Sequence, residues 1–314
     1  MKRLLVIRFS ALGDVALLAP VLRAAAQQYP HVRITMLSHP RMADLFADMP
    51  ENITFCGVNP KQQPLREIVA RLGTFDAVAD MHGVWRSLYI RGCMRLRGAH
   101  VAVIRKGRRA RFLLTHGLRR RPLPHISLRY AAVLARLGMP VTLPAPAHTD
   151  GQGIGIAPFA AHVGKIYPLD RMERVVQLLS LRGRHVVLFG SRDEKPLLDT
   201  WAEKYPNVEN LAGRFPLSGE IERMRGLRVM LTMDSANMHL ASLAGTRVLS
   251  VWGATHPDAG FLGYGQQPTD CILLNLPCQP CSVYGQRPCR YADYRCLNIA
   301  PEVLVERIIQ ACDD

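Results

Sequence analysis

The sequence lacks several features that would place it directly in a broad class. No apolar run reaches the roughly 18 uninterrupted residues of a membrane-spanning helix. The most apolar N-terminal stretch, residues 15–26, is broken by Pro20 and Arg23. Disorder is excluded as well, because 48% of the residues are hydrophobic and 21% are charged. We expect a globular chain, and its 314 residues suffice for two domains of roughly 150 residues each.

Glycine-rich phosphate loops are also missing. A dinucleotide fingerprint, G-x-G-x-x-G, would follow the first predicted strand, but Gly13 is the only glycine among residues 1–28. There is no Walker A loop, because the pair Gly164-Lys165 is followed by Ile166. The chain has no Tyr-x-x-x-Lys pair either. These absences disfavour a nicotinamide dehydrogenase and a nucleotide-sugar epimerase.

Acidic residues are missing from a long stretch of the first half. None lies between Asp80 and Asp150, although residues 86–129 contain 13 Lys or Arg. Residues 1–150 hold 23 Lys and Arg against 8 Asp and Glu, whereas residues 151–314 hold 17 of each. A charge distribution this one-sided favours an anionic partner such as nucleic acid, an anionic lipid surface or a phosphorylated substrate. A solvated basic face is the alternative.

Aromatic residues are scarce in this basic stretch. Tyr89 and Phe112 are the only ones within residues 86–129, which provides little of the stacking platform that single-stranded nucleic acid needs. We therefore expect no nucleic-acid partner. A non-catalytic protein that binds another polyanion stays as an alternative interpretation.

The N-terminus resembles a signal peptide only superficially. Lys2 and Arg3 precede apolar residues, but Arg8 and Asp14 interrupt the apolar segment. We expect no export signal, and hence a cytoplasmic chain whose eight cysteines are mostly free thiols.

Four of these cysteines are closely spaced near the C-terminus, in the pattern Cys278-x2-Cys281-x7-Cys289-x6-Cys296. The Cys-x2-Cys pair suits a metal ion, but the second pair lacks the usual knuckle spacing. A structural metal, a disulfide-capable cluster and packed free thiols all remain open. For the active site we expect no metal and no cofactor.

Hydrophobic periodicity alternates between strands and helices along both halves. In the first half, strands are expected at residues 4–9, 32–37, 53–57 and 76–80, and helices at 14–28, 41–47, 64–72 and 127–137. In the second half, strands are expected at residues 153–157, 185–189, near 208, 229–233 and 248–252, and helices at 168–182, 194–204, 219–225 and 235–244. Such alternation indicates parallel sheets with helices on both faces.

A stretch rich in proline and glycine, residues 140–153, matches neither period and marks the predicted domain boundary. The sequence thus predicts an α/β chain of two Rossmann-like doubly wound domains, residues 1–148 and 149–314. Two such domains facing a central cleft form the GT-B architecture of many glycosyltransferases. A single large doubly wound domain is the alternative.

Polar residues stand where three of the predicted strands end, the place where open parallel sheets bind ligands. Asp14 follows the first strand and could accept a proton or merely cap the next helix. Lys165 adds a positive charge to a loop that leads into a helix, as in phosphate sites, or is a solvated lysine. Asp234 and Ser235 precede a helix that carries His239, which is a ligand or a core residue.

Several blocks, taken together and in order, resemble glycosyltransferase family 9, the lipopolysaccharide heptosyltransferase family. They are RFSALGDVALLAPVL, FDAVADMHGVWRS, HISLRYAAVLARLG, PFAAHVGKIYPLDRM, MDSANMHLASLAGTRVLSVWGATHP and, after the cysteines, CLNIAPEVLVERI. The resemblance covers nearly the whole chain and implies an inverting glycosyltransferase. Its expected reaction moves heptose from ADP-heptose onto an anionic lipopolysaccharide core or lipid A-type acceptor. The alternative is a transferase of the same fold that uses another nucleotide sugar for a different surface glycan.

The resemblance also implies roles for individual residues. Asp14 matches the family's catalytic base and Lys165 the catalytic lysine that neutralises the donor diphosphate. The residues implied in donor binding are Ala160, Lys165, Glu194, Leu217, Asp234, Ser235, Ala236 and His239. Those implied in acceptor binding are Ser10, Gly13, His82, Arg86, His125 and Arg129. The implied partners are an ADP-linked nucleotide sugar, an anionic glycolipid and the cytoplasmic face of the inner membrane, which the protein would contact peripherally.

Two positions depart from the family pattern. Ala160 and Ala161 stand where members often carry a Ser or Thr hydroxyl that contacts the phosphates, and Tyr167 replaces the usual tryptophan. These differences leave the identity of the sugar open.

Overall fold

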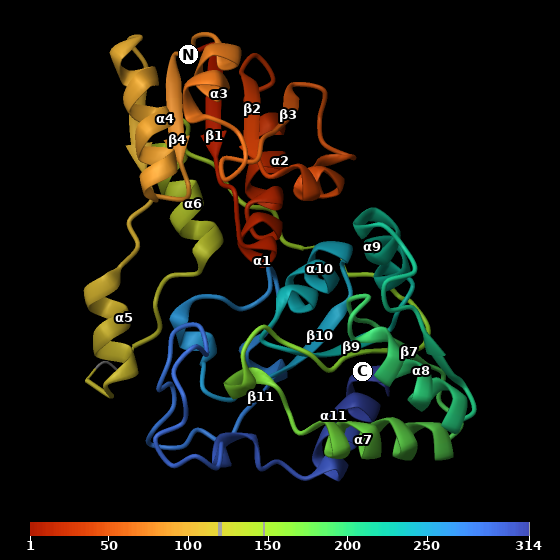
Figure 1. Ribbon diagram of the computed structural model, residues 1–314. Coiled ribbons are helices and arrows are strands. Elements are labelled where there is room, and N and C mark those ends of the chain that lie inside the picture. Colours follow the sequence, from red (N-terminus) through yellow and green to blue (C-terminus); the bar gives the residue numbers. More distant parts are fainter. Residues whose placement is uncertain (119–120, 147, 314) are drawn as a thin grey trace. The chain divides into compact units, whose positions relative to one another are not determined.

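The computed structural model describes residues 1–118, 121–146 and 148–313. They divide into two compact units (Figure 1). Unit 1 comprises Met1–Gly107 and Pro124–Ala145, and unit 2 comprises Arg108–Leu123 and Pro146–Asp314. Unit 2 therefore includes a short segment from the first half of the chain, which contains helix α5 (Arg108–Thr115).

Unit 1 is built on a parallel sheet of five strands in the order β3-β2-β1-β4-β5, counted over its described residues. The strands are β1 (Arg3–Ile7), β2 (Arg33–Ser38), β3 (Ile53–Gly57), β4 (Ala77–Asp80) and β5 (His100–Val103). Central strand β1 is a continuous apolar run because helices cover both of its faces. Its last residue, Ile7, is in register with Leu37 on one side and Asp80 on the other. The loops after β1 and β4 therefore leave the sheet at the same edge.

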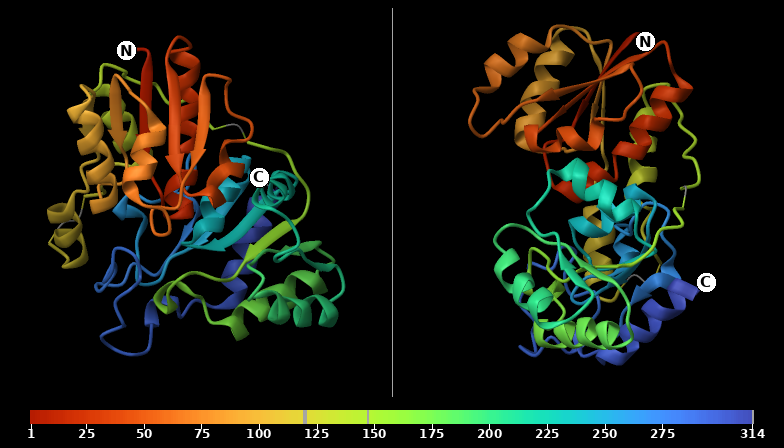
Figure 2. Two further views of the ribbon diagram at one scale, coloured as in Figure 1. Left: turned by 45° about the horizontal axis from the view of Figure 1, so that its top comes forward. Right: turned by 90° about the vertical axis from the view of Figure 1, so that its right-hand side faces the viewer.

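Helices cover both faces of this sheet (Figure 2, right). Helices α3 (Leu65–Leu72) and α4 (Trp85–Leu96) contact each other, and their residues Ile68 and Ile90 share a core with Leu5 and Ile7 of β1. Helix α2 (Ala19–Gln28) contacts α6 (Ile126–Ala135). The other helices in the described part of unit 1 are the short helix α1 (Leu12–Ala16) and the 3-10 helix η1 (Pro40–Phe46).

Unit 2 is built on a parallel sheet of six strands, again counted over described residues, in the order β11-β10-β9-β6-β7-β8. The strands are β6 (Ile154–Ala157), β7 (Val186–Leu188), β8 (Val208–Asn210), β9 (Val229–Met233), β10 (Arg247–Val251) and β11 (Cys271–Ile272). The order reverses direction at β6, as it does at β1 in unit 1. Both sheets are thus doubly wound, and the edge at the C-terminal ends of the strands is where such sheets bind ligands.

The helices of unit 2 are α7 (Leu169–Leu181), α8 (Lys195–Lys204), α9 (Leu217–Arg225), α10 (Ala236–Ala244) and α11 (Pro301–Asp313). Helices α7 and α11 contact each other, and Val176 and Ile308 share a core with Ile156 and Leu231 of the sheet. Helices α9 and α10 contact each other, and α10 also contacts β9 and β10. Within the part of the chain that the structure describes, no helix combines the length and apolarity needed to cross a membrane.

The structure confirms the predicted alternation and corrects it in two places. The single helix expected at residues 14–28 is two helices, because Pro20 lies at the start of α2, where its missing N–H costs nothing. The helix expected at residues 41–47 is the 3-10 helix η1. Among the described residues, five α-helices and strands were not predicted, namely α4, β5, α5, β11 and α11, and neither were the short 3-10 helices η2 to η5.

Candidate active site

The first polar cluster lies at the C-terminal end of β1 in unit 1. Arg8 Nη2 forms an ion pair with Asp14 Oδ2 at 2.5 Å, and Arg8 Nη1 donates to the Met81 carbonyl at 2.6 Å. The Tyr130 hydroxyl donates to the carbonyl of Asp14 at 3.2 Å, and its ring centroid lies 5.7 Å from the Arg8 guanidinium carbon. Asp14 is in the first turn of α1, whose N-cap residue is Ala11, so it is not the cap of that helix. Its carboxylate is held by a largely buried cation.

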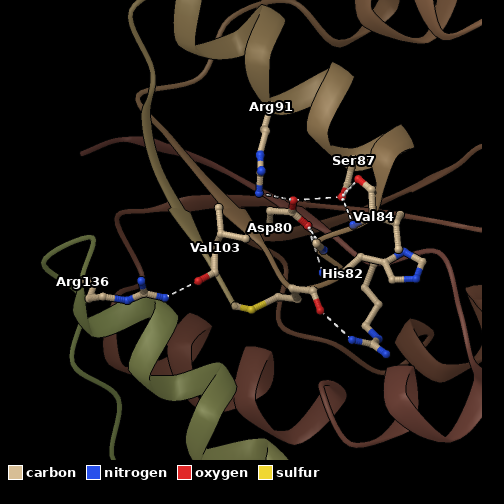
Figure 3. Close-up of polar contacts among 10 residues, drawn as sticks. Asp80, His82, Val84, Ser87, Arg91, Val103 and Arg136 are labelled. Atoms are coloured by element: carbon tan, nitrogen blue, oxygen red, sulfur yellow. Dashed lines mark hydrogen bonds and ion pairs between the residues drawn. The ribbon is translucent and has the colours of Figure 1, made fainter. Parts of the chain in front are cut away.

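Asp80 organises the neighbouring loop, which follows β4 (Figure 3). Its buried carboxylate accepts from the backbone N–H groups of His82 and Gly83 at 2.9 and 2.8 Å. It also accepts from Ser87 Oγ at 2.9 Å and from Arg91 Nη1 at 2.8 Å, both on α4. A buried carboxylate with four donors is well satisfied and fixes the segments that supply them. Asp80 was not among the predicted site residues, although an acid at the end of an apolar strand is a usable signal.

His82, a predicted acceptor residue, lies beside this cluster. Its Nδ1 accepts from the Phe9 N–H at 3.3 Å. Burial, with the charge of Arg8 as the next cause, lowers the pKa of His82 to about 4. The ring is therefore neutral at pH 7 and offers a hydrogen bond rather than a charge. Two other predicted acceptor residues, Ser10 and Gly13, belong to the same β1–α1 segment; Ser10 is exposed and Gly13 is buried in α1.

The remaining predicted acceptor residues lie on two helices of unit 1. Arg86 is in the first turn of α4, and its Nε donates to the Pro60 carbonyl at 3.1 Å. His125 is the N-cap of α6 and accepts the Ser127 N–H at 3.2 Å. Arg129 lies one turn further along α6 and donates to the Arg105 carbonyl. Each of these two arginines thus donates a hydrogen bond to a backbone carbonyl.

The second polar cluster lies in unit 2, at the C-terminal ends of the paired strands β6 and β9. Lys165 Nζ forms an ion pair with Asp234 Oδ2 at 3.0 Å, and the two side chains are only 13% and 10% exposed. Thr255 Oγ1 donates to the same carboxylate oxygen at 2.8 Å. Ser235 is the N-cap of α10, and its side chain makes no capping hydrogen bond. The first-turn N–H groups of α10, which begins at Ala236, have no intrahelical acceptors and favour an anion together with the lysine.

The other predicted donor residues come from loops at the same edge of this sheet. Ala160 follows β6, Glu194 follows β7 and Leu217, the first residue of α9, follows β8. Glu194 Oε2 accepts the Ser191 N–H at 2.6 Å and so closes the turn after β7. His239 lies one turn into α10 and is buried. The structure thus gathers all the predicted donor residues along one edge, with Lys165 and Asp234 in direct contact.

The C-terminal loop of unit 2, the segment that contains Ser282 and Gly285, supports Lys165, a role that was not predicted from the sequence. Gly285 has φ +80°, and a Cβ built on it would lie 2.5 Å from Lys165 Cδ. The Gly285 N–H donates to Ser282 Oγ at 2.9 Å, and the Ala254 N–H donates to the Gly164 carbonyl at 2.7 Å. The aliphatic part of Lys165 therefore lies against a backbone that only glycine allows to approach so closely.

The four clustered cysteines lie next to this loop and line one small cavity: Cys278, Cys281, Cys289 and Cys296. Burial raises the pKa of Cys296 to about 11 and also raises that of Cys281, so both are protonated thiols at pH 7. All eight cysteines are free thiols. Among the described residues, no group of three or more His, Cys, Asp or Glu side chains is placed to hold a metal ion.

Known proteins match this chain over most of its length. The sequence model of glycosyltransferase family 9 (heptosyltransferase) matches residues 69–292. Lipopolysaccharide heptosyltransferase 3 of Escherichia coli is 24% identical over 283 residues, which cover 77% of this chain and 81% of that protein. The structure of E. coli ADP-heptose lipopolysaccharide heptosyltransferase II is similar with a TM-score of 0.72 at 19% identity, covering 99% of this chain and 98% of that one. The structure of E. coli heptosyltransferase WaaC with ADP gives 0.69 at 18% identity, covering 98% and 99%.

The two doubly wound parallel sheets and these likenesses define a glycosyltransferase of the GT-B fold. The chain belongs to glycosyltransferase family 9, the heptosyltransferase family. The predicted fold class, family and enzyme class are confirmed. The roles of individual residues and the assignment of acceptor and donor to separate domains stay predictions.

Proposed function

We propose that the protein transfers heptose from ADP-heptose, with inversion, onto an anionic acceptor of the lipopolysaccharide core or lipid A type. The observation that carries this proposal is the Lys165–Asp234 pair, 3.0 Å apart and largely buried at the start of α10. A positive charge and free helix N–H groups are what a sugar diphosphate needs. The family and the similar structure with ADP favour an ADP-linked heptose among the possible donors.

Donor activation belongs to unit 2 in this proposal. As the bond between the anomeric carbon and the diphosphate oxygen breaks, negative charge grows on the leaving ADP. Lys165 and the first N–H groups of α10 stabilise that charge, while Asp234 and Thr255 fix the position of the ammonium group. Electrostatic help of this kind is usually the largest contribution to catalysis, and removing one donor costs about 10²–10³ in rate.

Acceptor activation belongs to unit 1. Asp14 acts as general base: it takes the proton of the acceptor hydroxyl as that oxygen attacks the anomeric carbon in line with the departing diphosphate. Arg8 and Tyr130 hold Asp14 at the end of β1. A positioned base of this kind contributes about 10²–10⁴ in rate.

The basic charge of the first half gives the acceptor its binding site. A phosphorylated glycolipid presents several negative charges, and Arg86, Arg129 and the basic residues within 105–109 are the cations that would meet them, whereas Arg111 is buried. Such an acceptor places the enzyme at the cytoplasmic face of the inner membrane, in peripheral contact with it.

A nucleotide screen tests the donor assignment. Thermal unfolding is followed with ADP, UDP, GDP and CMP for the wild type, Lys165→Ala and the control Lys61→Ala, whose side chain is exposed in unit 1. We expect ADP-selective stabilisation, about 2.7 kcal/mol at 100 times Kd, that is lost in Lys165→Ala and kept in Lys61→Ala. Selective stabilisation by another nucleotide would indicate a donor sugar other than heptose. The alanines at 160 and 161, which depart from the family pattern, would agree with that result. No stabilisation by any of them would favour the non-catalytic polyanion binder.

A further inference from the structure

Helix α4 of unit 1 carries large apolar side chains on the face that points away from the sheet. Trp85, Leu88, Tyr89 and Leu96 are 63%, 54%, 45% and 90% exposed. With 3.6 residues per turn, these four positions fall within about 100° of the helix circumference, as one stripe that only Gly92 interrupts. The opposite side of the helix is buried and packs on unit 1; it consists of Ser87, Ile90 and Met94. The stripe therefore takes no part in core packing. Exposed apolar patches of this kind mark interaction sites.

Arginines flank the apolar stripe on both sides. Arg86 lies about 100° from Trp85 around the helix on one side, and Arg95 about 80° away on the other. The Arg86 guanidinium carbon is 4.3 Å from the Trp85 ring centroid, and Arg95 is exposed. No acidic residue accompanies them anywhere between Asp80 and Asp150. The surface around the stripe is thus cationic, with no anionic side chain from this segment to balance it.

Hydrogen bonds and core packing hold the inner side of helix α4 against unit 1. Asp80, fully buried at the end of β4, accepts hydrogen bonds from Ser87 and Arg91 on the inner side of α4 (Figure 3). Ile90 and Met94 pack into the core that includes β1. The orientation of α4 is therefore fixed. Its outward apolar side chains cannot turn into the core, because the inner side of the helix is already packed there.

We propose that the stripe formed by Trp85, Leu88, Tyr89 and Leu96 docks onto the surface of an anionic bilayer, with the axis of α4 parallel to the membrane. Trp and Tyr favour the boundary between headgroups and acyl chains. Amphipathic helices that lie in this boundary combine such aromatic and leucine side chains with flanking basic residues, which attract anionic lipids. A second copy of the chain is a poor occupant, because a symmetric contact through this face would bring arginines against arginines.

This inference deepens the proposed function and rests on it for the lipid-linked acceptor, but bilayer docking itself needs no turnover. Binding to bare vesicles therefore tests the docking surface, whereas the nucleotide screen tests the donor site. A protein that binds ADP but not vesicles would contradict bilayer docking and leave the donor site intact.

Tryptophan fluorescence gives a direct readout because Trp85 is 63% exposed, whereas Trp201 and Trp252 are 2% and 1% exposed. The full-length protein is mixed with vesicles of phosphatidylglycerol and phosphatidylethanolamine, and separately with neutral phosphatidylcholine vesicles. We expect a blue shift with the anionic vesicles only, and quenching by lipids whose acyl chains carry bromine. Trp85→Phe should abolish both signals. Vesicle binding with no change in Trp85 emission would mean adsorption by charge alone and would overturn the proposal.

Co-sedimentation with the same vesicles tests the leucines. The double variant Leu88→Ser/Leu96→Ser should bind anionic vesicles at least about tenfold more weakly, since two exposed leucines no longer transfer out of water. The matched control is Leu181→Ser on α7, where the leucine is 74% exposed on unit 2; it should bind like the wild type. Both variants should keep the ADP-induced thermal shift. Equal vesicle binding by the double variant, or a wild-type dimer without vesicles that the double variant loses, would contradict bilayer docking.

Discussion

Glu220 lies in the first turn of α9 with its carboxyl group partly buried, and burial raises its pKa to about 7. The folded protein thus binds this proton more tightly than the unfolded chain, in which the pKa stays near 4.5. The stabilising contribution of the protonated form is complete below about pH 4.5 and is lost as the pH rises through about 7.

Glu220→Gln should therefore change stability in a pH-dependent way. Relative to the wild type, we expect a gain in the free energy of unfolding of about 1–3 kcal/mol at pH 8 that disappears near pH 4.5. Denaturant unfolding at several pH values measures it, with Glu222→Gln, exposed on the same helix, as the control. A difference between wild type and Glu220→Gln that is the same at every pH would contradict the assigned pKa.

The contribution of His82 to stability changes with pH in the opposite direction to that of Glu220. Its pKa of about 4 lies below the usual 6.5, so the neutral ring stabilises unit 1 above pH 6.5, and this contribution is lost as the pH falls towards 4. Measurements on the whole chain combine this trend with that of Glu220. The difference between Glu220→Gln and wild type isolates the carboxyl group.

At the scale of elements, the C-terminal loop and the η2 segment (Val163–Lys165) act together. A Cβ at Gly285 would lie 2.5 Å from Cδ and 2.6 Å from Cγ of Lys165. Gly285→Ala should displace the ammonium group and weaken ADP binding about tenfold, a loss of about 1.4 kcal/mol.

The matched control for this variant is Gly183→Ala. Gly183 has φ +70°, close to the +80° of Gly285, but nothing lies within 4 Å of a Cβ built there. Both variants should lose about 1–2 kcal/mol of stability from the left-handed backbone, and only Gly285→Ala should lose ADP affinity by calorimetry. Equal ADP affinities in the two variants would contradict the prediction that the loop at Gly285 positions Lys165 for ADP binding.

The fold could be predicted well where a strand is buried throughout. Residues 229–233 were predicted with the bounds of β9, because this central strand is a buried and mostly apolar run between polar ends. The bounds of the edge strand β3, residues 53–57, were also predicted, although that strand is only partly buried. Helix α4 was missed because apolar residues occur on both of its sides, with Ile90 inward and Leu88 outward, and arginines interrupt each turn. Such a helix lacks the single apolar face on which sequence periodicity depends.

The candidate site could be predicted residue by residue but not as a set of contacts. Asp14, Lys165 and Asp234 follow buried strands and were identified individually. Their partners were not identified. Thr255, which donates a hydrogen bond to Asp234, lies 21 residues further along the chain. Gly285, which lies against Lys165, belongs to a loop whose sequence gives no sign of this contact. Pairings of this kind arise from the way strands are ordered in a sheet, which local pattern does not encode.

For the whole molecule, the uneven charge is the dominant feature. The net charge of +15 resides in residues 1–150, since residues 151–314 carry equal numbers of acids and bases. Exposed charges are screened over about 8–10 Å at 0.1–0.15 M salt, whereas largely buried pairs such as Lys165–Asp234 are screened much less.

Salt should therefore separate acceptor from donor binding. Between low salt and about 0.3 M, we expect KM for the phosphorylated acceptor to rise about tenfold and KM for the nucleotide sugar to change less than about twofold. Initial rates with each substrate varied in turn measure both. The variant Arg108→Gln/Arg109→Gln, at two exposed positions of the basic stretch, should flatten the acceptor's dependence, and Arg182→Gln, exposed outside that stretch, should not. Parallel increases in both KM values would contradict an acceptor site built on this charge.

In the proposed mechanism, Asp14 activates the acceptor while Lys165 holds the donor. ADP release from ADP-heptose with a lipid A-type acceptor, measured for wild type and Asp14→Asn alongside ADP affinity by calorimetry, tests this division of roles. We expect turnover by the wild type, a loss of kcat of about 10²–10⁴ in Asp14→Asn, and ADP affinity within about twofold of wild type in that variant. Turnover of Asp14→Asn near the wild-type rate, or a loss of ADP affinity as large as the loss of rate, would contradict it.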